Sequence, residues 1–337
     1  MVHENYHEVS AGDPVACGRE LGRMFGSIVR DYIADEQGGK AWPQQKRDAQ
    51  VLLDKTAKAF PAYVAELQAY ADAARVPLLD LWTMSISDEL DGDDDEKCTT
   101  VVTNNGRLIS HNEDWDADST DDICILKRTY GDVTTLELYY YGCPLGGTAL
   151  SICSRGYVQA INSLDSTDWQ AGVPKLVIGR RIAELQNADA ELAQVLKIPR
   201  SSGFAHNLVD RNGRVTSVEC TATRQAVRQP PIPFVHTNHF LDTGLECLQG
   251  DTDGKSTFRR YDEACKLVQP AMADAGLLQL TSDQTCGKTD SILNRNTIAR
   301  GIVDLDRRVV SLWLRRESDK GWIDYPIDFF FGPVATV

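Results

Sequence analysis

The spacing of the apolar residues changes at residue 98, and this change divides the chain into two parts with different secondary structure. Before residue 98, apolar residues recur every three or four positions, which is typical of amphipathic helices. After it, short alternating runs are separated by Asn, Asp and Gly, which is typical of antiparallel hairpins. The acidic run "DGDDDE" at 91–96 lies between the two parts, and its like charges with nothing to bury predict an exposed connector.

The N-terminal part is predicted to be helical. Asp13 is a candidate N-cap before a proline, and an apolar stripe of Leu21, Met24, Phe25 and Ile28 follows it. The periodicity predicts helices over 14–36, 47–60, 61–75 and 77–90.

The C-terminal part is predicted to be an antiparallel α+β structure. Turn signals of Asn, Asp, Arg and Gly separate paired runs in five hairpins, at 98–114, 123–141, 148–164, 203–221 and 297–316. Helical runs occur at 173–185, 190–197 and 256–272. Antiparallel sheets usually cover one face with helices, so we expect these helices to pack on the sheets.

The charge balance excludes one class of partner. The chain of 337 residues has 49 acidic and 35 basic side chains, a net charge of −14, and no basic run. Its overall field would repel a phosphate backbone, so we expect no nucleic-acid partner. The polar opening "MVHENYHEVSAGDP" and the lack of an apolar run of about 18 residues predict neither a secretion signal nor a membrane partner, and hence a cytoplasmic protein.

The cysteines indicate neither disulfides nor a zinc ribbon. There are nine, an odd number, and no two form a CxxC pair. Most are expected to be reduced core thiols, including Cys220 in "SVECTAT". Cys98 differs, because acids precede it and hydroxyl residues follow it.

The first predicted hairpin brings polar residues to Cys98. A two-residue turn at Asn105 and Gly106 sets Cys98 opposite Glu113, and a three-residue turn sets it opposite Asn112. Either register places the segment ending at Asp114 beside the cysteine. We interpret this as an arrangement for nucleophilic catalysis.

A base for Cys98 is not evident among the histidines. His111 is close in sequence, but on a strand it points to the face opposite that of Asn112. The α-amino group of a cysteine has a pKa of about 7.7–8.0, which suits proton transfer near neutrality. That group exists only if the Lys97–Cys98 bond is cut, and an exposed connector before residue 98 makes such a cut feasible.

Three blocks resemble one family. "CTTVVT…HNEDW", "GVPKLVIGRRIAE" and "PFVHTNHF", in this order, resemble the isopenicillin N acyltransferase (acyl-CoA:6-aminopenicillanic acid acyltransferase) family of self-processing N-terminal nucleophile (Ntn) hydrolases. The resemblance covers most of the chain, including "AGDPVACGRELGRMFG". It implies a four-layer αββα sandwich. It also implies a precursor that cuts itself before Cys98 into fragments 1–97 and 98–337, which stay associated as one structural unit.

The resemblance also implies roles for individual residues. Cys98 would be the nucleophile with its own α-amine as the base, and Asn238 would donate to the oxyanion with a backbone N–H group. Asp114 matches the family's aspartate, which hydrogen-bonds near the nucleophile or holds the substrate amine. Asn112 and Glu113, which precede Asp114 on the same strand, are candidate substrate-binding residues because the hairpin register brings them beside Cys98. The resemblance also implies a backbone donor at Gly146 or Gly147 and a substrate-binding role for Arg295.

The substrate is predicted only as a class. Lys97 replaces a residue that is often glycine before the nucleophile, a departure that concerns self-cleavage. Glu113 replaces a tryptophan of the penicillin enzyme, and the substrate-binding Ser-Arg pair of that enzyme is not cleanly reproduced, so a penicillin substrate is not implied. Bile-salt hydrolases match less well, because they carry an arginine shortly after the nucleophile. We predict hydrolysis of a small N-acyl or aminoacyl amide such as a β-alanyl amide, with no cofactor. Homo-oligomerisation is left open by the sequence.

Three alternatives remain open at this point. One is acyl transfer to an amine, and another is an unprocessed binding protein with the same fold. The third is a metallohydrolase, but His236 and His239 lie at odd spacing on a predicted strand and so face opposite sides. The "DWDADSTDDICI" segment lacks the glycine and the last glutamate of a calcium loop, so we predict no metal site.

Overall fold

The structure is a computed structural model that describes residues 2–91, 98–252 and 256–332. Lys97 and nearly all of the predicted connector lie outside the described residues, so those two predictions are not tested. The helices are α1 (Pro14–Gln37), α2 (Trp42–Ala59), α3 (Pro61–Ala74), α4 (Leu78–Ser85), α5 (Ser87–Asp91), α6 (Lys175–Ala183), α7 (Ala188–Val195), α8 (Thr257–Leu267) and α9 (Asp274–Thr281). Within the described ranges, no helix combines the length and apolar character needed to cross a bilayer.

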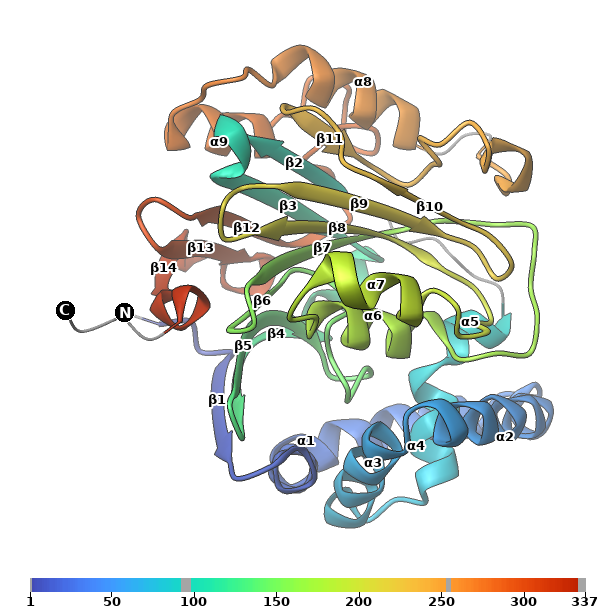
Figure 1. Ribbon diagram of the computed structural model, residues 1–337. Coiled ribbons are helices and arrows are strands. Elements are labelled where there is room, and N and C mark those ends of the chain that lie inside the picture. The colour runs from blue at the N-terminus through green and yellow to red at the C-terminus, as the bar shows by residue number, and fades with distance from the viewer. Residues whose placement is uncertain (1, 92–97, 253–255, 333–337) are drawn as a thin grey trace.

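The strands form two sheets that lie face to face (Figure 1). The eight-stranded sheet has the order β1-β4-β5-β6-β7-β8-β9-β10 and the six-stranded sheet the order β11-β2-β3-β12-β13-β14. The first consists of β1 (Tyr6–Ala11), β4 (Ile123–Tyr130), β5 (Val133–Tyr140), β6 (Ser151–Cys153), β7 (Tyr157–Ser163), β8 (Phe204–Asp210), β9 (Val215–Cys220) and β10 (Gln225–Arg228). The second consists of β2 (Thr99–Thr103), β3 (Leu108–Asp114), β11 (Phe234–His236), β12 (Thr297–Asp304), β13 (Val309–Leu314) and β14 (Ile323–Pro326).

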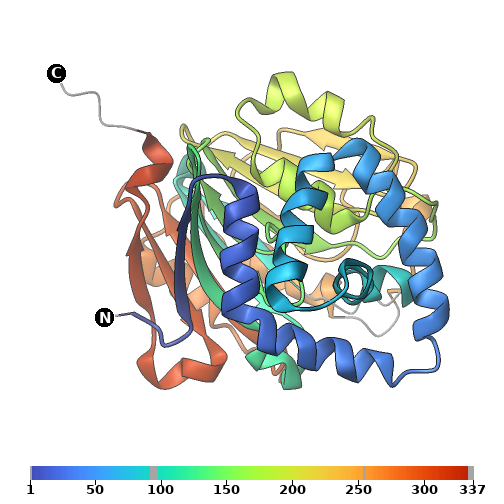
Figure 2. The ribbon, with the colours of Figure 1, turned by 90° about the horizontal axis from the view of Figure 1, so that it is seen from below.

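Three apolar clusters hold four layers together. One cluster fills the space between the sheets and includes Val102, Ile109 and Leu136. A second packs α1 to α4, α6 and α7 against the outer face of the eight-stranded sheet, as Figures 1 and 2 show. The third packs α8 and α9 against the six-stranded sheet. The predicted αββα sandwich and all five predicted hairpins are therefore confirmed.

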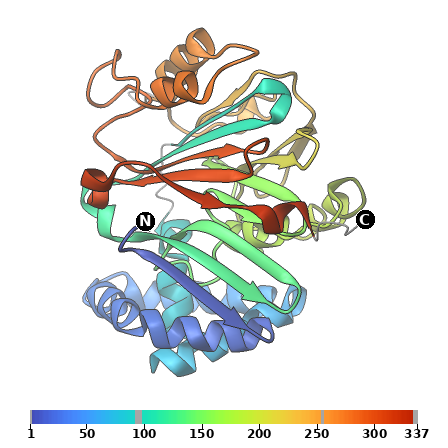
Figure 3. The same ribbon diagram turned by 90° about the vertical axis from the view of Figure 1, so that its left-hand side faces the viewer.

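The first strand was not predicted from the sequence. β1 runs parallel to β4, with Tyr6 paired to Ile125, whereas the other described strand pairs are antiparallel (Figure 3). Only Val9 of this strand is buried, so its six residues lack the alternation that would have identified it. The N-terminal part thus contributes a strand to the larger sheet as well as its helices.

Helix α1 begins as predicted. The Asp13 carboxylate accepts the backbone N–H of Ala16 at 2.8 Å, which is the bond expected of an N-cap. Leu21 and Phe25 are buried against the sheet. The prediction is wrong for Met24, which is 40% exposed because the buried stripe of the helix is narrower than the sequence pattern indicates.

Candidate active site

The β2–β3 hairpin has the register predicted for the two-residue turn. Thr99 pairs with Asn112 and Thr103 with Leu108, so continuing the ladder by one residue sets Cys98 opposite Glu113. The turn needs residues that tolerate a positive φ, and Asn104, Asn105 and Gly106 have φ angles of 53°, 53° and 79°. A Cβ atom on Gly106 would lie 1.8 Å from the Gly213 carbonyl oxygen, so glycine is required there.

The hairpin presents two faces with different chemistry. The inner face is turned toward the eight-stranded sheet and carries Thr100, His111 and Glu113, with the Cys98 sulfur close to the last two. The outer face is turned toward α8 and α9 and carries Asn112 and Asp114. Alternation along each strand separates the two sets.

Asn238 holds the backbone of the proposed nucleophile. Its Oδ1 atom accepts the N–H of Cys98 at 2.8 Å. Its Nδ2 group donates to the Ser163 carbonyl oxygen at 3.0 Å, and its own backbone N–H donates to Thr257 Oγ1 at 2.8 Å. The structure therefore brings two predicted site residues, Asn238 and Cys98, into direct contact.

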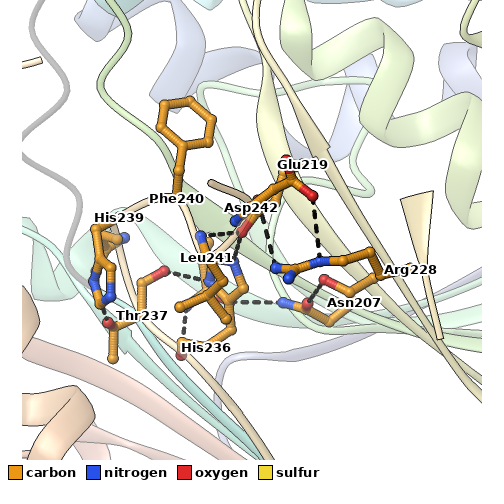
Figure 4. Close-up of polar contacts among 12 residues, drawn as sticks. Asn207, Glu219, Arg228, His236, Thr237, His239, Phe240, Leu241 and Asp242 are labelled. Carbon is orange, nitrogen blue, oxygen red and sulfur yellow. Dashed lines mark hydrogen bonds and ion pairs between the residues drawn. The ribbon is translucent and has the colours of Figure 1, made fainter. Parts of the chain in front are cut away.

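The segment that carries Asn238 is fixed by a buried carboxylate (Figure 4). Glu219 accepts the backbone N–H groups of Leu241 at 2.7 Å and Asp242 at 2.9 Å, and it lies 2.9 Å from His236 Nε2. His239 instead lies 2.9 Å from Thr257 Oγ1 through Nδ1. β11 ends at His236, so His239 lies beyond the strand and the predicted alternation of faces does not apply to it. The two rings nevertheless contact different side chains, Glu219 and Thr257.

Arg260 was not predicted, and it is the largest addition to the site. It extends from α8, is fully buried, and its Nη1 donates to the Cys98 carbonyl oxygen at 2.7 Å and to Thr99 Oγ1 at 2.9 Å. Its Nη2 donates to Asn238 Oδ1 at 2.8 Å. Burial lowers the pKa of Arg260, and the attraction of Asp114 and Cys98 opposes that change. Arg260 lies at helical spacing from Thr257 and Ala264 on the buried stripe of α8, but the sequence alone does not separate it from Arg259.

Asp114 lies on the outer face beside this arginine. Its side chain is fully buried and Oδ2 accepts from Asn294 Nδ2 at 2.6 Å. Burial raises its pKa to about 6, although Arg260 works in the opposite direction. A shift in the β3–β12 register between Thr297 and Ala299 lies opposite this end of β3, where bulges commonly redirect side chains.

The remaining predicted site residues have other hydrogen-bond partners. Asn112 is buried and donates through Nδ2 to the carbonyl oxygens of Thr281 and Ile292, at 3.0 and 2.9 Å, so it joins β3 to the layer of α9. Arg295 is exposed, and its backbone N–H donates to the Lys288 carbonyl oxygen.

Gly146 and Gly147 use their backbone donors within the fold. Gly146 N–H donates to the Cys143 carbonyl oxygen at 2.8 Å, and Gly147 N–H donates to Glu137 Oε2 at 2.7 Å. Both have positive φ, 67° and 73°, and a Cβ on Gly146 would lie 2.5 Å from that carboxylate. In this conformation neither N–H points to an external acceptor.

The inner face of the hairpin holds a buried ionisable cluster. His111 Nε2 lies 2.6 Å from Glu113 Oε2, and the Tyr140 hydroxyl donates to Glu113 Oε1 at 2.7 Å. Potential ligand atoms of Cys98, His111 and Glu113 lie within 4.8 Å of one another. Among the described residues this is the one such group of three that could hold a metal ion, and here a hydrogen bond joins two of its members.

A cavity of about 350 Å³ adjoins this cluster. Tyr140 lines the cavity and donates to Glu113, so one hydrogen bond separates the cavity wall from the cluster. Trp115, Tyr32 and Phe204 give the wall aromatic surface. Its charged residues are Asp35, Glu36, Asp88, Glu89, Asp122 and Lys175. Burial raises the pKa of Glu36 and of Glu89, and Glu89 already accepts hydrogen bonds from the fold. Even so, five acidic residues against one lysine favour a cation.

A match to a family model shows which protein family the chain belongs to. The model described as acyl-coenzyme A:6-aminopenicillanic acid acyl-transferase matches residues 101–319. The chain belongs to this family. The predicted resemblance is therefore confirmed, and with it the Ntn hydrolase type of αββα fold. The chain is accordingly an enzyme of the amide hydrolase and acyltransferase type that acts on small molecules.

Individual relatives are distant. The beta-alanyl-dopamine/carcinine hydrolase of Drosophila melanogaster is 24% identical over 355 aligned positions, which cover 90% of each protein. Penicillin V acylase from Agrobacterium tumefaciens has a TM-score of 0.44 and 13% identity, over 65% of this chain and 83% of that one. A mutant of the conjugated bile acid hydrolase from Clostridium perfringens has a TM-score of 0.38 and 13% identity, over 69% and 92%.

Proposed function

We propose that this chain is an N-terminal cysteine amidohydrolase that cuts its own Lys97–Cys98 bond. The observation that carries the proposal is the double anchorage of Cys98. Cys98 lies immediately before β2. Its backbone N–H donates to Asn238 Oδ1 at 2.8 Å, and its carbonyl oxygen accepts from Arg260 Nη1 at 2.7 Å, so side chains hold both of its backbone polar groups. A nitrogen held in this way becomes, after the cut, an α-amine fixed beside its own thiol.

Each residue then has a role in turnover. The Cys98 α-amine takes the thiol proton, and the sulfur attacks the carbonyl carbon of the substrate amide. Asn238 Oδ1 orients the amine, while its second Nδ2 hydrogen stabilises the oxyanion. Arg260 adds positive charge, and Asp114 balances that charge from the outer face. Fragments 1–97 and 98–337 stay associated, because β1 and the five N-terminal helices are part of the sandwich.

The cavity supports a cationic substrate. Its five carboxylates would attract an ammonium group, and its aromatic residues would contact an amine portion of moderate size. A β-alanyl amide carries both features, and the Drosophila relative is named for such substrates. We therefore propose hydrolysis of a small aminoacyl amide of the β-alanyl type.

Mass spectrometry of the purified chain tests this proposal. We expect a fragment that begins at Cys98, and we expect Cys98→Ala to remain at full length and to hydrolyse no amide. A panel of β-alanyl, N-acetyl and N-fatty-acyl amides, with and without an acceptor amine, would separate hydrolysis from acyl transfer. Full turnover by an intact chain or by the Cys98→Ala variant would refute the proposal.

A further inference from the structure

The self-cutting step needs a proton acceptor that turnover does not. Before the cut, the Cys98 nitrogen belongs to a peptide bond, whose lone pair is delocalised into the carbonyl group. Its one hydrogen is donated to Asn238 Oδ1 at 2.8 Å. This nitrogen therefore cannot take the thiol proton, and the base used in turnover does not yet exist.

We propose that Glu113, paired with His111, accepts the Cys98 thiol proton during self-cleavage. This inference rests on the proposed function and extends it to the precursor. Glu113 occupies the position opposite Cys98 in the hairpin, and the ligand atoms of all three residues lie within 4.8 Å of one another. The three side chains are at most 1% exposed, so bulk water does not compete as the acceptor.

The hydrogen bonds around His111 determine how many protons the pair holds. Asn162 Oδ1 accepts from Asn207 Nδ2 at 2.9 Å, and the Thr100 hydroxyl also donates to it at 2.9 Å. Because that hydroxyl has a single hydrogen, it must accept from His111 Nδ1, 3.0 Å away. His111 therefore carries a proton on Nδ1.

A second proton lies between His111 and Glu113. The contact of 2.6 Å between Nε2 and Oε2 requires a hydrogen, and Nδ1 already carries its own. The pair is then neutral overall, which is the favourable state for two buried ionisable groups. With the shared proton on the ring, Glu113 is a carboxylate that the Tyr140 hydroxyl holds through Oε1 at 2.7 Å.

The proposed step balances in protons and charge. The Cys98 thiol proton passes to Glu113, and the resulting thiolate lies near the His111 imidazolium and the Arg260 guanidinium. The sulfur forms a bond to the carbonyl carbon of Lys97, and the C–N bond of the peptide breaks. Glu113 returns the proton to the departing nitrogen, which becomes the α-amine. Water then hydrolyses the thioester, which restores the thiol and leaves Lys97 with a free carboxylate.

Isosteric variants test this assignment. Glu113→Gln and His111→Gln keep the size of each side chain but remove the proton acceptor or the ring charge. We expect full-length chains with either change to cut themselves about 100-fold more slowly than wild type, the usual contribution of a general base. The rate is measured by mass spectrometry of freshly purified precursor.

Turnover is measured separately in the same variants. In a second version of the full chain, residues 92–97 are replaced by the recognition sequence of a site-specific protease that cuts before residue 98. We expect the loss in self-cleavage to exceed the loss in turnover by about tenfold or more, because the α-amine is the base once it is free. His206→Gln is the matched control, since His206 is equally buried, on β8, and we expect its precursor to be cut at the wild-type rate.

The outcomes distinguish this inference from the proposed function. If wild type cuts itself and both variants cut at the wild-type rate, the inference fails and the proposed function stands. Equal losses in self-cleavage and in turnover would also overturn the inference, because they indicate a structural role. A wild-type chain that stays intact would refute the proposed function itself.

Discussion

The two faces of the β2–β3 hairpin make an instructive comparison, because one strand supplies both. On the inner face, His111 and Glu113 form a hydrogen-bonded pair next to the Cys98 sulfur. On the outer face, Asp114 and Arg260 carry opposite charges, and Arg260 binds the Cys98 carbonyl oxygen. The inner face is thus suited to moving a proton, whereas the outer face is suited to holding the backbone.

This difference shows how a single turn determines the chemistry of a site. A slip of one residue in the hairpin would exchange the two faces, because strand side chains alternate. His111 and Glu113 would then meet α8, and Asp114 would enter the space between the sheets. The φ angles of the turn and the close contact of Gly106 with Gly213 prevent that slip.

The largest expected effect comes from the residue that joins Cys98 to Arg260. Asn238→Ala removes the acceptor of the Cys98 nitrogen and the proposed oxyanion donor. We expect kcat to fall by about 10²- to 10³-fold, the usual loss for such a donor. Steady-state kinetics on a β-alanyl amide would measure it. Asn212→Ala, in the exposed β8–β9 turn, is the control, and equal losses in both variants would contradict the role.

Asp114→Asn tests the charge on the outer face through stability. The folded-state pKa is about 6 and the ordinary value is 3.8, so ionisation destabilises the folded state as pH rises between them. Removing the charge should raise the free energy of unfolding by up to about 3 kcal/mol at pH 7. The gain should vanish below about pH 3, where wild-type Asp114 is protonated in both states.

Urea unfolding of both proteins across this pH range is the measurement. A gain that is the same at pH 4 and pH 7 would show that ionisation of Asp114 is not its cause. A loss at pH 7 would show that the carboxylate is needed to balance Arg260.

Arg260→Lys sharpens the comparison between charge and geometry. Lysine keeps the positive charge but lacks the planar fork that reaches Cys98 and Asn238 together. Losing one charged hydrogen bond should lower kcat by about 10- to 100-fold. Arg259→Lys is the matched control, because the Arg259 side chain is 69% exposed on the same helix. If Arg260→Lys keeps the wild-type kcat, the positive charge of Arg260 is sufficient and its planar geometry is not required.

The smallest expected effect concerns the cavity beyond the inner face. Glu36→Gln removes one of its five carboxylates and should raise KM for a cationic amide by about threefold, roughly 0.7 kcal/mol, with kcat retained. A neutral amide of the same size should show no change. Asp31→Asn provides the control, since Asp31 is exposed on the same helix and does not line the cavity. An equal rise for the neutral amide would argue against recognition of charge.

Local patterns were sufficient for much of the fold but not for the partners of Cys98. The Asn-Gly turn determined the hairpin register. The prediction that the side chains of His111 and Asn112 point to opposite faces of the sheet is also confirmed. Arg260 could not be chosen over its neighbour from the sequence, because only the phase of α8 decides which arginine points inward. Its contacts with Cys98, 162 residues earlier, depend on tertiary packing.

Strand β1 shows a second limit of sequence patterns. Its pairing with β4 joins residue 6 to residue 125, and one of its six residues is buried. Neither local propensity nor alternation records such a long-range pairing. The cavity was missed for a similar reason, because its wall combines α1, α4, α5 and α6 with the ends of strands.

The position of β1 also determines whether refolding of this molecule depends on protein concentration. In the uncut chain, β1 and β4 belong to one polymer, and refolding does not depend on protein concentration. After a cut before Cys98, the same parallel pairing holds two separate polymers together, and refolding becomes a second-order reaction. Dilution would then slow refolding of the cut enzyme but not of the uncut chain. The time for which the cut enzyme stays active would therefore depend on the rate at which the two fragments dissociate.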